Sequence, residues 1–122
     1  MTVQEAIARA DSLRDNRMSM DEKIRLLSTL DGRIKQEVID THEGGNNETF
    51  KPYDENDMGR DLLVFAPYDD LYVRYLDMHI LLGMGEYDKY NAAAVVYDQA
   101  MQAFRAHYNA THMPRQVRGR VL

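Results

Sequence analysis

The sequence contains no cysteine and no tryptophan, and only three prolines among its 122 residues. Without cysteine, the chain cannot form a disulfide, a thiolate metal site or a cysteine nucleophile. No apolar run approaches the ~20 residues that cross a bilayer as a helix, and the N-terminus lacks a signal-peptide pattern. We therefore expect no membrane association and a protein that stays in the compartment where it is made.

Length and charge indicate the number of domains and the kinds of partner that the chain can bind. A chain of 122 residues, 44% hydrophobic and 29% charged, has the size and composition of one globular domain. Residues 1–98 carry 11 basic and 20 acidic side chains, whereas residues 99–122 carry four arginines and no acid. An acidic body is a poor general nucleic-acid binder, but a basic tail can dock on an acidic partner or a phosphate backbone.

Periodic apolar residues dominate the second half of the sequence. They recur at alternating steps of three and four, which places them on one face of a helix. The pattern predicts a third helix with Tyr68, Leu71, Tyr75, Met78 and Leu82 on that face, and a fourth over residues 86–111 with Tyr87, Tyr90, Ala94, Tyr97, Met101, Phe104 and Tyr108. The short Gly83-Met84-Gly85 turn between them predicts two antiparallel helices whose stripes face each other.

Two more helices are predicted in the first forty residues. Thr2 with Glu5, and Ser19 with Glu22, have the spacing of capping boxes that open helices. The expected buried faces are Val3, Ile7, Ala10 and Leu13 in the first helix, and Ile24, Leu27, Leu30, Ile34 and Val38 in the second, which reaches about Asp40. Gly32 costs roughly 1 kcal/mol relative to Ala inside a helix. It predicts either a kink or close contact with another helix, or simply a locally weak helix.

Residues 41–66 interrupt the helical pattern. The run from Leu62 to Phe65 precedes Ala66-Pro67, and the residue before proline favours extended geometry, so this run is either one short strand or a plug in the core. Pro67 suits the first turn of the third helix. The predicted fold is all-α: a small bundle of about four helices with a long C-terminal helix, an irregular loop or short extended segment at 41–66, and an extended C-terminal arm. Residues 1–112 form the helical bundle domain and residues 113–122 the basic arm.

No group of residues has the pattern of an active site or a metal centre. Asp54, Asn56 and Gly59 match three positions of a calcium-binding loop, but Met58 and Phe65 occupy two positions that require oxygen ligands. The histidines are dispersed, and neither a phosphate-binding glycine loop nor a framed serine nucleophile is present. We therefore expect no catalysis, no cofactor and no metal.

The tyrosine stripe has two interpretations. Such a stripe can stack on bases or on a ligand, but at helical spacing it more often forms a core. Eight tyrosines carry hydroxyl groups that need partners, so part of the stripe is expected at a wet edge or a subunit contact.

Three segments carry a resemblance to a known family. They are residues 62–72 (LLVFAPYDDLY), residues 85–91 (GEYDKYN), and Ala103-Phe104 followed by residues 108–114 (YNATHMP). In this order they look like small helical proteins encoded in structural-gene clusters of tailed bacteriophages and prophages, which are similar to head–tail connector (adaptor) proteins. The resemblance covers residues 62–114, and the loop at 41–60 has no counterpart in it.

The resemblance implies a structural role without catalysis. Connector proteins of this kind are all-helical subunits of a ring, twelve-fold in the family, that sits under the portal of the virion neck. For this chain it implies self-association, contact with the portal and with a downstream neck or tail protein, and genomic DNA passing through the ring without specific binding. Its location would be the virion neck, after assembly in the bacterial host cytoplasm.

The C-terminal arm supplies the expected partner-binding residues: Arg115, Val117, Arg118, Arg120, Val121 and Leu122. The arm lacks the apolar area to fold on itself, so we expect it to become ordered on a partner, with its arginines on carboxylates. The alternative function is a freestanding helical regulator that binds a protein or nucleic acid through the same basic tail.

Overall fold

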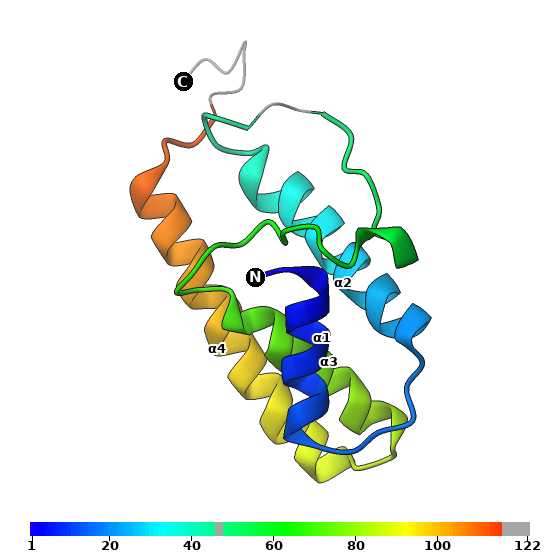
Figure 1. Ribbon diagram of the computed structural model, residues 1–122. Coiled ribbons are helices and arrows are strands. Elements are labelled where there is room, and N and C mark those ends of the chain that lie inside the picture. Colours follow the sequence, from blue (N-terminus) through cyan, green and yellow to red (C-terminus); the bar gives the residue numbers. More distant parts are fainter. Residues whose placement is uncertain (46–47, 116–122) are drawn as a thin grey trace.

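The computed structural model describes residues 1–45 and 48–115, and these ranges fold into an all-helical bundle (Figure 1). The α-helices are α1 (Val3–Leu13), α2 (Met20–Ile34), α3 (Asp70–Gly83) and α4 (Tyr87–Thr111). A π-helical turn, η1 (Lys35–Ile39), continues α2, and a 3-10 turn, η2 (Glu55–Asp57), lies in the long loop. Within the described ranges there is no β-strand, only two isolated bridges. The predicted all-α bundle is confirmed.

Helix α3 is the centre of the bundle. Leu71, Tyr72 and Leu76 on this helix are fully buried, and most of its remaining side chains are buried as well. Helices α4, α1 and α2 all pack on it, and α4 runs alongside it as the antiparallel neighbour that the short glycine turn predicts. Gly85 in that turn has a φ of +74°, which a side chain would strain. In Figure 1, α4 and α2 lie along opposite edges of the molecule.

The local signals at the helix starts are confirmed. Thr2 and Glu5 form a capping box, with the Thr2 hydroxyl accepting from the Glu5 amide at 3.1 Å. The Ser19 hydroxyl accepts from the Glu22 amide at the start of α2. A Cβ at Gly32 would lie 3.4 Å from the ring of Phe50. The close contact with another helix predicted at this glycine is therefore not found, because its neighbour is a loop residue.

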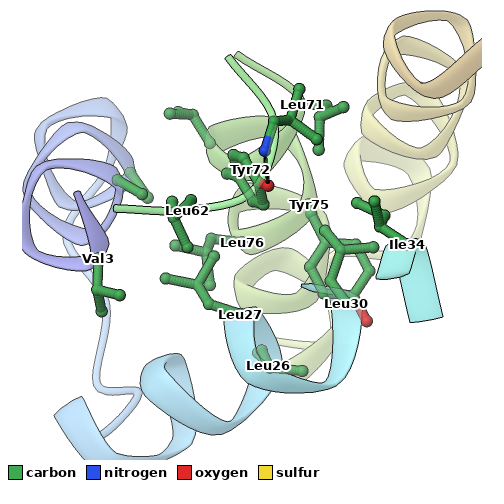
Figure 2. Close-up of a cluster of buried hydrophobic side chains, with 14 of the residues drawn as sticks. Val3, Leu26, Leu27, Leu30, Ile34, Leu62, Leu71, Tyr72, Tyr75 and Leu76 are labelled. Atoms are coloured by element: carbon green, nitrogen blue, oxygen red, sulfur yellow. Dashed lines mark hydrogen bonds between the residues drawn. The ribbon is translucent and has the colours of Figure 1, made fainter. Parts of the chain in front are cut away.

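The segment before α3 plugs the core and does not form a strand. Leu62 and Val64 are buried, whereas Phe65, the last residue of the segment, is 48% exposed. Figure 2 shows Leu62 inserted among Val3 of α1, Leu27 of α2 and Leu76 of α3. The Ala66-Pro67 peptide bond is cis. Helix α3 begins only at Asp70, so the prediction that Pro67 lies in its first turn is wrong.

The predicted helix faces are correct in direction but not along their full length. All five predicted core positions of α2 and η1 are buried. In contrast, Leu13, Leu82 and Tyr87 are exposed by 46%, 42% and 65%. In α4 only Met101, Phe104 and Tyr108 are buried, while Tyr97 is half-buried. The periodicity identifies the face that meets α3, but α3 alone covers the first turns of α4 because no other helix packs extensively there.

Candidate protein-interaction surfaces

A buried carboxylate lies at the junction of α2, α3 and the long loop. Asp31 has no exposed surface, and its oxygens accept hydrogen bonds from the Tyr53 hydroxyl at 2.5 Å, the Tyr72 hydroxyl at 2.6 Å and the Leu63 amide at 3.0 Å. Burial raises the pKa of Asp31 and of both tyrosines, and the carboxylate raises the tyrosine pKa values further. With every partner inside the core, this cluster holds the loop on the helices and offers no access to a substrate.

The C-terminal arm begins in contact with its own chain. Residues 113–115 lie antiparallel to residues 41–43, with the Glu43 amide donating to Met113 and the Arg115 amide donating to Thr41, each at 2.8 Å. This part of the arm therefore becomes ordered without a partner, which differs from the expectation that the arm needs one. We call the paired residues 41–43 and 113–115 the arm clasp.

His42 fixes the arm clasp to the helices. This histidine is buried, with Nδ1 2.6 Å from the Val38 carbonyl oxygen and Nε2 2.7 Å from the side-chain oxygen of Asn109 on α4. Its ring meets Tyr108 edge-on, and Tyr108 in turn stacks on His112 at 3.9 Å between ring centroids. The end of α2–η1 and the end of α4 are thus joined through one imidazole.

The structure places only one of the six predicted arm residues. The guanidinium of Arg115 donates to the Gly45 carbonyl oxygen, so it is bound within its own chain and half-buried. Val117, Arg118, Arg120, Val121 and Leu122 lie outside the described residues. The arm clasp nevertheless fixes where the arm leaves the bundle, beside the loop that follows residue 43.

The solvent side of α4 carries little charge over most of its length. Its exposed residues from position 91 to position 110, which we call the α4 outer face, are Asn91, Ala92, Val95, Val96, Asp98, Gln99, Gln102, Ala103, Ala106, Asn109 and Ala110, and Asp98 is the one charged residue among them. At ~1.5 Å per residue this face is about 30 Å long. Val95 and Val96 are exposed by 56% and 42%. A surface helix normally presents charged side chains to water, so this face has the composition of a contact surface.

A pocket with a basic rim borders the α4 outer face. It measures about 270 Å³ and is lined by Arg14, Arg74, Asp77, Leu81, Lys89, Ala92, Ala93 and Val96. Arg14 pairs with Asp77 at 2.6 Å, and Arg74 pairs with Asp70 at 3.0 Å. Within the described ranges Lys89 forms no ion pair. Three cations and one acid give this basic pocket a net positive charge.

A groove with an acidic rim lies on α2. It measures about 550 Å³ and is lined by Asp21, Ile24, Arg25, Ser28, Thr29, Gly32, Phe50, Pro52, Tyr53, Asp54 and Glu55. Its uncharged lining residues include Gly32 and Phe50, and a Cβ built at Gly32 would lie 3.4 Å from the Phe50 ring. Arg25 is paired with Glu22. Among the described residues neither Asp21 nor Glu55 has an ion-pair partner, so this acidic groove has a net negative charge.

Other kinds of site find no support in the described ranges. No group of three or more metal-binding side chains is found there, and Asp54 caps η2 by accepting from the Asn56 amide. No described helix has the length and apolarity that a membrane span requires. No family model, curated protein or solved structure matches this chain. The candidate site is therefore defined by its surfaces alone.

One local pattern in the sequence indicates buried charged residues on α2. Asp31 and Lys23 are spaced from Leu27 by four residues on either side, so both fall on the apolar face of α2. A charged residue on such a face has to find a partner: Asp31 is held by Tyr53 and Tyr72, and Lys23 pairs with Asp11 at 2.8 Å. His42 and the acidic groove depend on contacts distant in sequence, and no local pattern indicates them.

Proposed function

We propose that this chain is a structural subunit of the neck of a tailed bacteriophage: a head–tail connector that forms a ring on the portal and joins it to a downstream neck or tail protein. The observation that carries the proposal is the α4 outer face, eleven exposed residues of which only Asp98 is charged, in a chain of which 29% is charged. A monomer gains nothing from such a face, whereas a subunit covers it on assembly. The resemblance over residues 62–114 gives the assembly its identity.

Two further features support a ring subunit. A ring requires a head-to-tail contact, and therefore two different sticking surfaces on each copy. The α4 outer face and the acidic groove on α2 are two such surfaces, and the two helices lie at opposite edges of the molecule (Figure 1). Residues 1–98 are acidic in balance, and phosphate backbones bind mainly through Lys and Arg. A ring of such bodies would let DNA pass through without adhering, in a twelve-fold arrangement if it follows the family.

The arm would dock on the portal. Its arginines suit carboxylates, and the arm clasp, from which the arm continues, lies at one end of the bundle, beyond α4. The alternative, a freestanding regulator that uses the same arm, gives the α4 outer face no role. We therefore place the protein in the virion neck, assembled in the host cytoplasm and without enzymatic activity.

The test uses heads purified from cells in which the gene for this chain is deleted. Purified chain is added to these heads, which are then sedimented and imaged by electron microscopy. The proposal expects the chain to co-sediment and to form a ring at the portal vertex, and tails to join only after its addition. A chain that stays monomeric and never sediments with heads would contradict the proposal and favour the regulator. Heads that carry no portal are the control.

A further inference from the structure

We infer that neighbouring copies associate head to tail, with the basic pocket and adjoining α4 outer face of one copy against the acidic groove on α2 of the next. The inference rests on the proposed function for its ring context and adds the identity of the two contacting surfaces. Its observation is that the two surfaces have opposite charge and include parts of α4 and α2, two helices that lie at opposite edges of the molecule (Figure 1).

The charged rims are complementary. The basic pocket has Lys89 without an ion pair in the described ranges, beside the paired Arg14 and Arg74. The acidic groove has Asp21 and Glu55, both exposed and likewise without an ion pair there. Opposite charges across an interface fix its register and exclude the same surface on the partner, because like charges would then meet. Two copies are therefore steered to meet pocket to groove.

The uncharged centres are complementary as well. Ala92 and Val96 connect the basic pocket to the α4 outer face. The uncharged lining residues of the acidic groove are Ile24, Ser28, Thr29, Gly32 and the loop residues Phe50, Pro52 and Tyr53. Because Ala92 and Val96 have small side chains, this part of α4 can approach that uncharged lining closely.

This arrangement is heterologous, so it can repeat. An interface that uses two different patches leaves one free patch of each kind on every pair of copies, and addition continues until a ring closes. A symmetric contact of α4 on α4 would stop at a dimer and would leave the acidic groove uncovered. The opposite charges of the two rims favour the repeating arrangement.

Cysteine cross-linking tests the inference cleanly because the native chain has no cysteine. We would prepare Ala92→Cys in the pocket, Thr29→Cys in the groove and the double variant, all of which keep the charged rims unchanged, and treat each with a short bismaleimide, both free and bound to the portal-bearing heads. Head-to-tail contact predicts no cross-link in either single variant, a covalent dimer in their mixture and a ladder of multimers in the double variant. Arg9→Cys with Thr29→Cys is the matched control, since Arg9 is exposed on α1, away from the basic pocket.

Charge reversal gives a second measurement. Lys89→Glu or Glu55→Lys alone should abolish the association, while the double reversal should restore it, since the pocket is then acidic and the groove basic. Arg9→Glu should leave association unchanged. Self-cross-linking of either single cysteine variant, or a double variant no different from its control in both conditions, would overturn the inference. If rings still form on heads, the proposed function survives that result; a ladder without attachment to heads would overturn the proposed function alone.

Discussion

The carboxylate of Asp31 on α2 and the hydroxyl of Tyr72 on α3 are 2.6 Å apart in the fully buried centre of the bundle. The same hydroxyl accepts from the Val64 amide at 2.8 Å, a bond that Figure 2 draws. These hydrogen bonds thus link α2, α3 and the buried segment of residues 62–65. Because each of these groups is removed from water, losing one member leaves the others without a partner.

Replacing Asp31 by Asn should destabilise the fold in a pH-dependent way. The asparagine side chain has one acceptor oxygen, and its NH₂ group would face the hydroxyl and amide donors that now bond to Asp31. We therefore expect the free energy of unfolding to fall by roughly 1–3 kcal/mol. Burial raises the folded-state pKa of Asp31. Its stabilising contribution is therefore present below the unfolded-state pKa of about 3.9 and is lost as the pH rises through the folded-state value.

Urea unfolding at a series of pH values measures this effect. The difference in unfolding free energy between wild type and Asp31→Asn should be largest near about pH 4 and shrink toward about pH 7. Asp15→Asn, at an exposed position, controls for the loss of one carboxylate. A difference that grows with pH would show that Asp31 is held as the anion and would contradict the assigned direction of its pKa.

Substitutions along the apolar stripe of α4 should destabilise the fold at its buried positions and have little effect at its exposed ones. Phe104 is 1% exposed, so Phe104→Ala should cost roughly 3–5 kcal/mol, and Met101→Asp should bury an unpaired charge. Tyr87 belongs to the same sequence stripe but is 65% exposed. Tyr87→Ala is therefore the matched control, expected within about 0.5 kcal/mol of wild type. Thermal melts followed by circular dichroism would reveal the contrast, and equal losses at Phe104 and Tyr87 would contradict it.

The sequence predicts elements well where local chemistry decides them. The capping box at Thr2, the buried face of α2 and the glycine turn at Gly85 are each specified by residues a few positions apart, and each is confirmed. The extent of burial is different, because it depends on which distant segments cover a face. For that reason periodicity places Leu13 on the buried face of the first helix, whereas it is 46% exposed in the structure.

The candidate surfaces show the same division. The basic arm is visible in the sequence as a run of arginines, but its pairing with residues 41–43 depends on a contact across some seventy positions that no spacing rule encodes. The basic pocket likewise combines Arg14, which follows the end of α1, with Arg74 on α3 and Lys89 on α4. Only the fold brings these charges together. Composition therefore predicts the acidic balance of residues 1–98 but not the basic pocket.

Substitution of His42 should loosen the arm clasp while the bundle stays folded. His42→Ala removes the contacts to Val38 and Asn109 and leaves a space beside Tyr108. We expect faster hydrogen exchange at the amides of Glu43 and Arg115, which donate within the clasp. His107→Ala, at a ring that stacks on Tyr68 instead, is the control. Unchanged exchange at both amides would show that the backbone pairing holds the arm without the histidine.

Truncation of the C-terminal arm should abolish attachment to the portal without unfolding the helical bundle. Deleting residues 116–122 keeps the arm clasp intact, whereas deleting 113–122 also removes the Met113 and Arg115 backbone bonds. Both truncated chains should retain the helical signal, and both should fail to attach to portal-bearing heads. The longer deletion should in addition lower the melting temperature slightly, because it exposes the edge at residues 41–43.

The arginines should account for most of that attachment. Changing Arg118 and Arg120 together to Glu should abolish co-sedimentation with heads, since the arm would then be repelled by the acidic surface that we propose for the portal. Changing both to Lys keeps the charge but loses the planar fork that binds a carboxylate through two hydrogen bonds, so attachment should weaken without vanishing. Wild-type attachment should fall as salt is raised. Heads that accept the truncated chain and still join tails would remove the arm from the docking role, and the contact with the portal would then have to lie on the bundle.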